Sequence, residues 1–361
     1  MTTSARASTT ACVRQFPDQR MYSMERKFAR GPAMRDVALA AGVSAQTVSR
    51  VLSEHPNVQD STRRRVLAAV NQLGYRRNNT ARALVTGQSK TIGVLTLATN
   101  NYSRSSLALG VELGAREAGY AVNSVTSALS TKALTDAVSR LVHQGVDGIV
   151  IAAPLLGAAD QIRQLTARIP TVSTDGSSGV FKDLVGVDQE LAAAIATTHL
   201  IDLGHKTVWH VAGPRDWSDA MARLESWRRT LRDAGKDVPP VLHGDWSPES
   251  GYRSGLILAR MPEVTAILVA SDEMAFGVIR ALSELGRRIP EDVSVVGIDD
   301  IDLAAYANPP LTTIRQSFED TGRRAVMHLV AQIANPDAES PPDLVAPTLI
   351  VRGSTAGPPR S

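Results

Sequence analysis

The segment MRDVALAAGVSAQTVSRVLS, residues 34–53, has the pattern of two short helices joined by a sharp turn. Val37 and Ala41 in the first half and Val48 in the second recur at helical spacing, which predicts a small shared core. Gly42 provides the permissive backbone that such a turn needs, and Ser44 suits the N-cap of the second helix. The segment therefore predicts a helix-turn-helix whose second helix presents its outer face to a partner.

A third helix is expected next, over TRRRVLAAVNQLG at residues 62–74. Its apolar residues recur at i, i+3, i+4 and i+7 from Val66, and the pattern stops at Gly74. Residues 1–32 show no sustained periodicity and are expected to form a disordered basic leader. The biological start could be Met1, Met24 or Met34.

The outer face of the second helix carries side chains that suit DNA. A glutamine such as Gln46 can bond adenine in the major groove, and an arginine such as Arg50 can bond guanine bidentately. Charge supports this interpretation, because residues 1–90 hold 15 Lys and Arg against 5 Asp and Glu, while the rest holds 24 against 31. Such asymmetry indicates an end that meets a polyanion, with a solvated basic tail as the alternative.

The rest of the chain alternates strands with helices. Runs such as TIGVLTL, DGIVIAAP, VTAILVAS and DVSVVGID read as strands, and each is followed or preceded by a helical stretch. This order predicts an α/β fold with parallel sheets covered on both faces. A chain of 361 residues exceeds one core, so we expect the strands to be divided between two lobes.

Composition and motifs exclude several classes of protein. Cys12 is the only cysteine, so the chain has no disulfide framework and no cysteine-clustered zinc site. Neither a signal peptide nor an apolar run of about 18 residues occurs, so we expect a cytoplasmic protein with no membrane partner. There is no HExxH, GxSxG or P-loop motif, and we expect no catalytic residues, no metal and no cofactor.

Two other functional classes are alternatives to DNA binding. An enzyme would turn over its ligand, whereas a regulator returns it unchanged. A solute-binding protein for transport would share a two-lobed body, but it needs an export signal and leaves the basic N-terminal helices unexplained.

The motif at the N-terminus has a specific resemblance. DVALAAGVSAQTVSRVL resembles the signature of the LacI/GalR (lactose repressor) family of bacterial transcriptional regulators, and the match continues through TRRRVLAAVNQLGYRRNNTARALVTGQSKTIGVL. Later segments resemble the family in the family's order, from about Met34 to Arg352: LGHKTVWHVAGP, GDWSPESG, ILVASDEMAFGVIRAL, DVSVVGIDD and PPLTTIRQSF.

The resemblance implies the following organisation. A three-helix helix-turn-helix head at 33–77 and a hinge helix or linker at 78–89 precede a two-lobed, periplasmic-binding-protein-like, doubly wound α/β body at 90–355. Lobe 1 would hold about 90–187 and 318–345, and lobe 2 about 188–317 and 346–355. The body would bind the effector and dimerise.

The resemblance also assigns DNA contacts. It implies base reading by Ala45, Gln46 and Arg50, and phosphate contacts by Ser44, Thr47 and Ser49. The stretch from Asn78 to Val85 matches the family's hinge helix, where Asn78 meets DNA and Leu84 is the apolar wedge inserted into the minor groove. Without the upstream motif, a plain linker would be the preferred interpretation of this stretch.

A ligand site is expected where strands of the two lobes end. Carboxylates and guanidinium groups near aromatic faces suit a polyol, since they accept from and donate to neighbouring hydroxyls. By analogy with the family, the effector-binding residues are Asp175, Arg223, Trp246, Ser271, Asp299 and Phe318.

One of these residues departs from the family, because sugar-responsive members commonly carry Asn where this chain has Ser271. A nucleobase or another non-sugar metabolite therefore stays open as effector. The function implied is a repressor of carbohydrate-metabolism genes that binds a palindromic operator in double-stranded DNA as a homodimer and responds to a small saccharide. The C-terminal GSTAGPPRS has no leucine heptads, so a dimer is expected rather than a tetramer.

Overall fold

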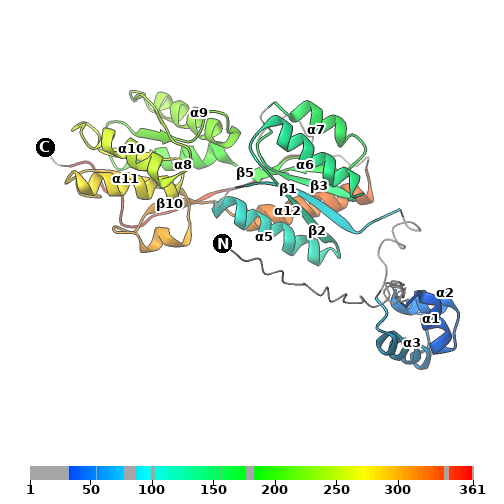
Figure 1. The fold of residues 1–361 in the computed structure, drawn as a ribbon. Coiled ribbons are helices and arrows are strands. Elements are labelled where there is room, and N and C mark those ends of the chain that lie inside the picture. The colour runs from blue at the N-terminus through cyan, green and yellow to red at the C-terminus, as the bar shows by residue number, and fades with distance from the viewer. Residues whose placement is uncertain are drawn as a thin grey trace, which may run out of the picture. The chain divides into compact units, whose positions relative to one another are not determined.

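The computed structural model describes residues 32–53, 55–76, 87–98, 102–155, 157–175, 183–336 and 341–359 (Figure 1). The chain divides into one unit at Met1–Ala81 and another at Arg82–Ser361. The expected leader, apart from Pro32, lies outside the described residues. Asn78 and Leu84 of the expected hinge helix lie outside them too.

The N-terminal unit holds three helices, α1 (Met34–Ala41), α2 (Ala45–Leu52) and α3 (Asp60–Leu73). Gly42 lies in the left-handed region with φ of 62°, and the Ser44 side chain accepts a hydrogen bond from the backbone N–H of Thr47 at 3.1 Å. Both features were predicted, because the turn needs a residue without a Cβ and the helix needs a cap. Val37, Val48 and Val66 are fully buried in the shared core.

The start of the third helix differs from the prediction. The third helix begins at Asp60 rather than at Thr62, and it ends as predicted before Gly74. Asp60 lies in the first turn, where a carboxylate interacts favourably with the free N–H groups of the helix.

The second unit contains two lobes, each built around a mainly parallel sheet. In lobe 1 the strand order is β2-β1-β3-β4. Helices α6 and α7 cover one face of this sheet, and α5 and α12 cover the other. The bounds are β1 Thr91–Leu97, α5 Tyr102–Glu117, β2 Ala121–Ser127, α6 Thr131–His143, β3 Gly148–Ala152, α7 Ala159–Leu165, β4 Thr171–Ser173 and α12 Phe318–Ala334.

In lobe 2 the strand order is β12-β10-β9-β8-β6-β7, and only β12 is antiparallel to its neighbour. Helices α8 and α9 pack on one face, and α10 and α11 pack on the other. The bounds are α8 Gln189–Asp202, β6 Trp209–Ala212, α9 Ser218–Asp233, β7 Leu242–His243, α10 Pro248–Leu258, β8 Ala266–Val269, α11 Asp272–Glu284, β9 Ser294–Asp299, the 3-10 helix η2 Asp302–Tyr306, β10 Thr312–Arg315 and β12 Thr348–Ile350.

The chain passes between the lobes three times. It leaves lobe 1 after β5 (Val185–Val187) to enter α8, returns between β10 and α12, and crosses again between β11 (Asp343–Val345) and β12. Strands β5 and β11 pair in parallel, which ties the first and third crossings together. Figure 1 shows these segments running between the two lobes.

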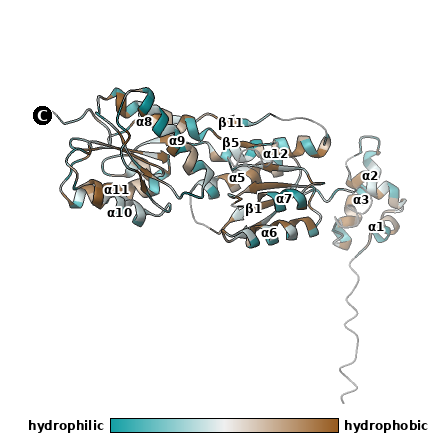
Figure 2. Cartoon of the chain, turned by 90° about the horizontal axis from the view of Figure 1, so that it is seen from above, coloured by the Kyte–Doolittle hydropathy of each residue, from teal (hydrophilic) through white to brown (hydrophobic). Residues whose placement is uncertain are grey.

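Hydrophobic strands sandwiched by amphipathic helices form both cores (Figure 2). Strands β3, β8 and β9 are buried along their whole length, as expected for parallel strands covered on both faces. In the described part of the chain, no helix has both the length and the apolar character needed to cross a membrane.

Candidate functional site

Helix α2 exposes the side chains that the sequence assigned to base reading. Ala45, Gln46 and Arg50 are exposed, while Val48 and Val51 on the opposite face are buried. The hydroxyls of Ser44 and Thr47, which were assigned to phosphates, lie 2.9 Å apart and hydrogen-bond each other. The helix therefore presents a polar face with one cation, Arg50, held on a rigid three-helix support.

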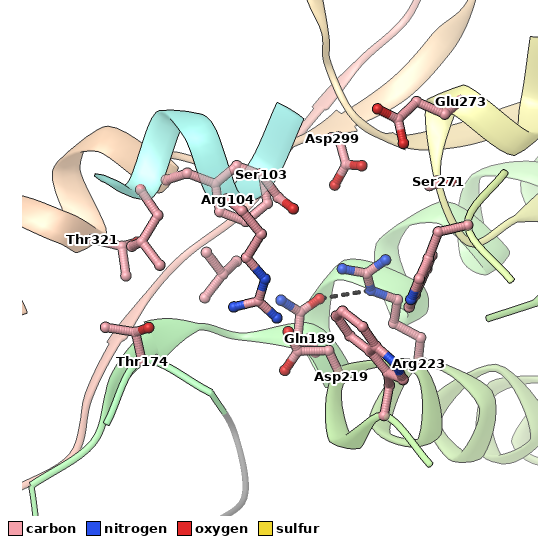
Figure 3. A pocket seen from close by; sticks show the side chains of 15 residues that line it. Ser103, Arg104, Thr174, Gln189, Asp219, Arg223, Ser271, Glu273, Asp299 and Thr321 are labelled. Atoms are coloured by element: carbon pink, nitrogen blue, oxygen red, sulfur yellow. Dashed lines mark hydrogen bonds between the residues drawn. The ribbon is translucent and has the colours of Figure 1, made fainter. Parts of the chain in front are cut away.

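A cavity opens where strands of both lobes end (Figure 3). Lobe 1 contributes residues of α5 and α12 and Thr174 after β4, and lobe 2 contributes Asp299 at the end of β9 and residues that follow β6, β7 and β8. The cavity brings together five of the six residues that the sequence assigned to the effector: Arg223, Trp246, Ser271, Asp299 and Phe318.

The sixth, Asp175, is 1% exposed and lies beside the cavity without lining it. Its carboxylate accepts a hydrogen bond from the hydroxyl of Ser218, at the start of α9 in lobe 2. The guanidinium of Arg104 lies 3.6 Å from the same carboxylate and stacks over the ring of Trp217, 5.2 Å from its centroid. Asp175 therefore belongs to a contact between the lobes.

Arg223 is a buried cation with free hydrogen-bonding capacity. It is 4% exposed, and it donates through Nε to Gln189 at 2.7 Å and through Nη1 to the carbonyl of Ala270. Among the described residues these are its only polar contacts, and its guanidinium lies over the ring of Trp246, 5.7 Å from the centroid. A guanidinium carries five N–H donors, so several remain for a ligand.

Trp246 forms an apolar wall of the cavity. Its ring meets that of Trp217 edge to face, with centroids 5.5 Å apart. The ring lies so close to Gly213 that a Cβ there would overlap it, which explains the glycine at the end of β6. The indole N–H is buried and has no hydrogen-bond partner among the described residues.

Asp299 ends β9 with a positive φ of 130°, and its carboxylate accepts a hydrogen bond from the side chain of Gln316 at 2.6 Å. Burial raises the pKa of Asp299 well above its ordinary value, although the charge of Arg223 opposes the shift. Glu273 is a second acid of the cavity whose pKa burial raises; it accepts from the backbone N–H of Tyr102. The cavity thus offers donors and acceptors on opposite sides.

Ser271 has a structural role besides lining the cavity. Its hydroxyl oxygen caps α11 by accepting from the backbone N–H of Met274 at 3.3 Å. Phe318 begins α12, and its ring meets that of Tyr102 edge to face with centroids 6.5 Å apart. Within the described residues, no group of three or more His, Cys, Asp or Glu side chains is arranged to hold a metal ion.

Sequence reasoning missed several residues that shape this site. Arg104 and Trp217 line the cavity, and Gln189 and Gln316 connect its two central polar residues. Gln189 follows Asp188, the residue that caps α8, and Gln316 follows the last residue of β10. No motif marked these positions, because their partners lie far away in the chain.

Two family models match the chain. Residues 33–78 match the model of bacterial regulatory proteins of the lacI family, and residues 197–355 match that of the periplasmic binding protein-like domain. The ribose operon repressor of Escherichia coli (strain K12) is 33% identical over 332 residues, which cover 89% of this chain and 99% of that protein. The chain belongs to the lacI family of bacterial regulatory proteins.

Solved structures of the family agree in fold over most of the chain. The lac repressor dimer bound to operator and the anti-inducer ONPF matches with a TM-score of 0.84 and 33% identity, covering 91% of this chain and 100% of that one. A complex of the regulator CelR with cellobiose matches with a TM-score of 0.68 and 31% identity, covering 90% and 99%. This member of the family is therefore a DNA-binding regulator of transcription.

Proposed function

We propose that this regulator represses carbohydrate-metabolism genes by binding a palindromic operator as a homodimer, and that a small saccharide in the cleft modulates the binding. The proposal that the cleft binds a saccharide rests on the arrangement of polar and aromatic side chains around Arg223. A buried guanidinium with unused donors faces the carboxyl group of Asp299 across the cavity, next to the ring of Trp246.

This arrangement suits neighbouring hydroxyl groups on an apolar ring. One hydroxyl can accept from a guanidinium and donate to a carboxylate, while the C–H face of a sugar packs on an indole. We assign effector contacts to Arg223, Trp246, Ser271, Asp299 and Phe318, and we keep Asp175 as the residue that joins the lobes beside them. The cellobiose complex of CelR supports a sugar, though not this particular one.

On DNA, α2 is the recognition helix. Gln46 and Arg50 would read base edges together with Ala45, and Ser44, Thr47 and Ser49 would contact phosphates. A two-fold dimer reads two half-sites that mirror its symmetry, as in the operator-bound lac repressor dimer. We assign residues 78–89 to a hinge helix or linker, with Asn78 and Leu84 contacting DNA, between a head at 33–77 and a body at 90–355.

Regulation requires that the effector bind the two states of the body unequally. If it prefers lobes arranged so that the paired hinges separate, it weakens operator binding, and DNA weakens effector binding by the same factor. A coupling of about 1–3 kcal/mol changes operator affinity about 5–150-fold, which is enough for a switch. A protein working in this way returns its ligand unchanged and acts where the genome is, in the bacterial cytoplasm.

The test has two parts. Purified full-length protein is screened by thermal shift against D-ribose, lactose, cellobiose and, for the nucleobase alternative, guanine, since a ligand of the native state raises the apparent Tm. Genomic fragments are then tested for retention with and without the compound that raises the Tm. We expect salt-sensitive retention of a palindromic fragment that a sugar changes.

Matched variants separate the two halves of the proposal. Asp299→Ala should abolish the thermal shift and leave retention of DNA intact, whereas Asp160→Ala, which removes an exposed carboxylate of α7, should change neither. A shift caused only by guanine would replace the saccharide with a nucleobase. Failure to retain any palindromic fragment would overturn operator binding.

A further inference from the structure

Four buried side chains form one continuous line of hydrogen bonds beside the cavity. Arg223 Nε donates to Gln189 Oε1 at 2.7 Å, Gln189 Nε2 donates to Gln316 Oε1 at 2.8 Å, and Gln316 Nε2 donates to Asp299 Oδ1 at 2.6 Å. None of the four residues is more than 8% exposed. Figure 3 shows the first of these bonds, from Arg223 to Gln189.

The two ends of the line fix its direction. A guanidinium can only donate and a carboxylate can only accept, so each amide has one orientation that satisfies both of its neighbours. If either amide turned over, like groups would face each other in a buried place, and leaving a buried donor or acceptor without a partner is unfavourable. The Arg223 end alone fixes the orientation of Gln189 and, through it, that of Gln316, because a guanidinium can only donate; Asp299 accepts at the far end through an unprotonated oxygen.

Both glutamines also lie where the chain crosses between the lobes. Gln189 is the first residue of α8 after the crossing from β5, and Gln316 follows β10 on the way back to α12. The backbone N–H of Asp188, next to Gln189, donates to the carbonyl of Val345 at 3.1 Å, which connects the first crossing to the third. The line thus joins Arg223 and Asp299 to two of the segments that connect the lobes.

We infer that Gln189 and Gln316 are positioning residues: they form a directional relay that couples Arg223 to Asp299 and couples both to two of the interlobe crossings. The relay itself stands on geometry, while its role in regulation rests on the proposed effector site. A ligand hydroxyl that donates to Asp299 or accepts from an unused N–H group of Arg223 binds to a residue at one end of the relay. Binding then changes the hydrogen bonding of the crossings directly.

The alternative is that each glutamine only fills space and satisfies its own neighbour. In that case residues 189 and 299 would be energetically independent, apart from repulsion through space when both are charged. A double-mutant cycle separates these possibilities, because it measures the coupling between two residues rather than the effect of either.

The variant Gln189→Glu reverses the direction in which the amide of Gln316 must point to satisfy its neighbours. A carboxylate at 189 can still accept from Arg223, but it can no longer donate to Gln316, so Gln316 must turn its amide nitrogen toward residue 189. Its carbonyl oxygen then faces Asp299, which must hold a proton to donate. Asp299→Asn resolves this conflict, since an amide at 299 can donate without a proton from solvent.

Thermal unfolding of the full chain without effector or DNA gives the readout. Asp299→Asn should raise the Tm of the Gln189→Glu protein at high pH, where Asp299 is ionised, and this gain should shrink as the pH falls and Asp299 takes up its proton. In the wild-type background the same substitution also removes a buried carboxyl group whose pKa is raised, so it should give a gain of the same sign there; the relay predicts a larger gain in the Gln189→Glu background, and the difference between the two gains is the coupling. Arg223, Asp272 and Glu273 also face Asp299, and they are the same in every arm of the cycle.

A third substitution distinguishes the relay from repulsion through space. In a Gln316→Met background the relay is cut while the charges at 189 and 299 remain, so the coupling should fall by at least half. Coupling of unchanged size in that background would show repulsion through space and overturn the relay. Absence of coupling with Gln316 present would overturn it as well.

Hydrogen exchange in the wild-type protein tests the relay even if the variants fail to fold. The Nε–H proton of Arg223, assigned by its loss in Arg223→Lys, should exchange with solvent much more slowly than that of the exposed Arg253. Equal exchange would contradict the relay. None of these experiments uses effector or operator, so their failure leaves the proposed function standing, and an unsuccessful sugar screen leaves the relay standing.

Discussion

The carboxylate of Asp272 accepts a hydrogen bond from the hydroxyl of Thr313 at 2.6 Å, beneath the loop that presents Asp299 to the cavity. Its other oxygen accepts from the backbone N–H of Ile301 at 3.0 Å. Asp299 and Asp300 both have positive φ angles, of 130° and 54°, which side-chain-bearing residues rarely adopt. A fully buried carboxylate thus holds a strained turn in place at the ligand site.

This carboxylate predicts a pH dependence of stability. Burial raises the pKa of Asp272 from 3.8 to about 6, against its hydrogen bonds from Thr313 and Ile301. Because the folded-state pKa is raised, its contribution to stability is fully present below about pH 4 and is lost as the pH rises through about 6. A shift of this size corresponds to roughly 3 kcal/mol at most.

The variant Asp272→Asn tests this dependence. An amide can accept from Ile301 and donate to the hydroxyl of Thr313, so it should keep the turn while removing the titration. The difference in Tm between variant and wild type should move in favour of the variant between about pH 4 and pH 6. Parallel curves for the two proteins over this range would contradict the shifted pKa.

Loss of the N-cap at Ser44 should destabilise α2 and leave the second unit unchanged. Replacing it with Ala removes the hydroxyl that accepts from Thr47 N–H, which should cost about 1 kcal/mol of local stability. Hydrogen exchange of the α2 amides should speed up accordingly. Ser61→Ala, in the first turn of α3, removes a hydroxyl that caps no helix and is the control. Equal exchange rates in the two variants would show that the cap contributes nothing.

Replacing Arg50 should change the DNA sequence preference of the protein. Its side chain is exposed on α2 and carries the only positive charge of that helix. Arg50→Ala should cost about 1–3 kcal/mol and relax the preference at one base pair of each half-site. Binding to a set of single-base operator variants measures this, with Arg253→Ala on α10 as a distant control. A uniform loss on every sequence would make Arg50 a phosphate contact.

Periodicity and chain chemistry were sufficient to predict α1, α2, the cap at Ser44 and the buried strands, because each depends on residues close together in the sequence. The five cavity residues were assigned by the resemblance to the family; the convergence of strand ends in parallel sheets supports the assignment only for Ser271 and Asp299, which lie at such ends. Short strands such as β5 and β7 carry too few residues to show a pattern. The contact of Gln189 with Gln316 spans 127 positions, so only the folded chain brings it together.

Ser271 combines a cap and a cavity position, and its two roles can be separated. Ser271→Ala removes the hydroxyl that accepts from Met274 N–H and should cost about 1 kcal/mol, or about 2–4 °C in Tm for a domain of this size. Ser271→Asn should restore most of that loss, because Asn ranks with Ser at N-cap positions. It would also place two amide donors at the cavity, where serine offers one hydroxyl.

Ser247 offers a matched control for these variants. It caps α10 in the same manner, accepting from Ser250 N–H at 3.1 Å, yet it does not line the cavity. Ser247→Ala should therefore lower the Tm about as much as Ser271→Ala while leaving the shift induced by a bound sugar unchanged. Substitutions at 271 should alter that ligand-induced shift, because they change a group that faces the ligand. A Tm for Ser271→Asn as low as that of Ser271→Ala would show that the side chain at 271 does not act as a cap.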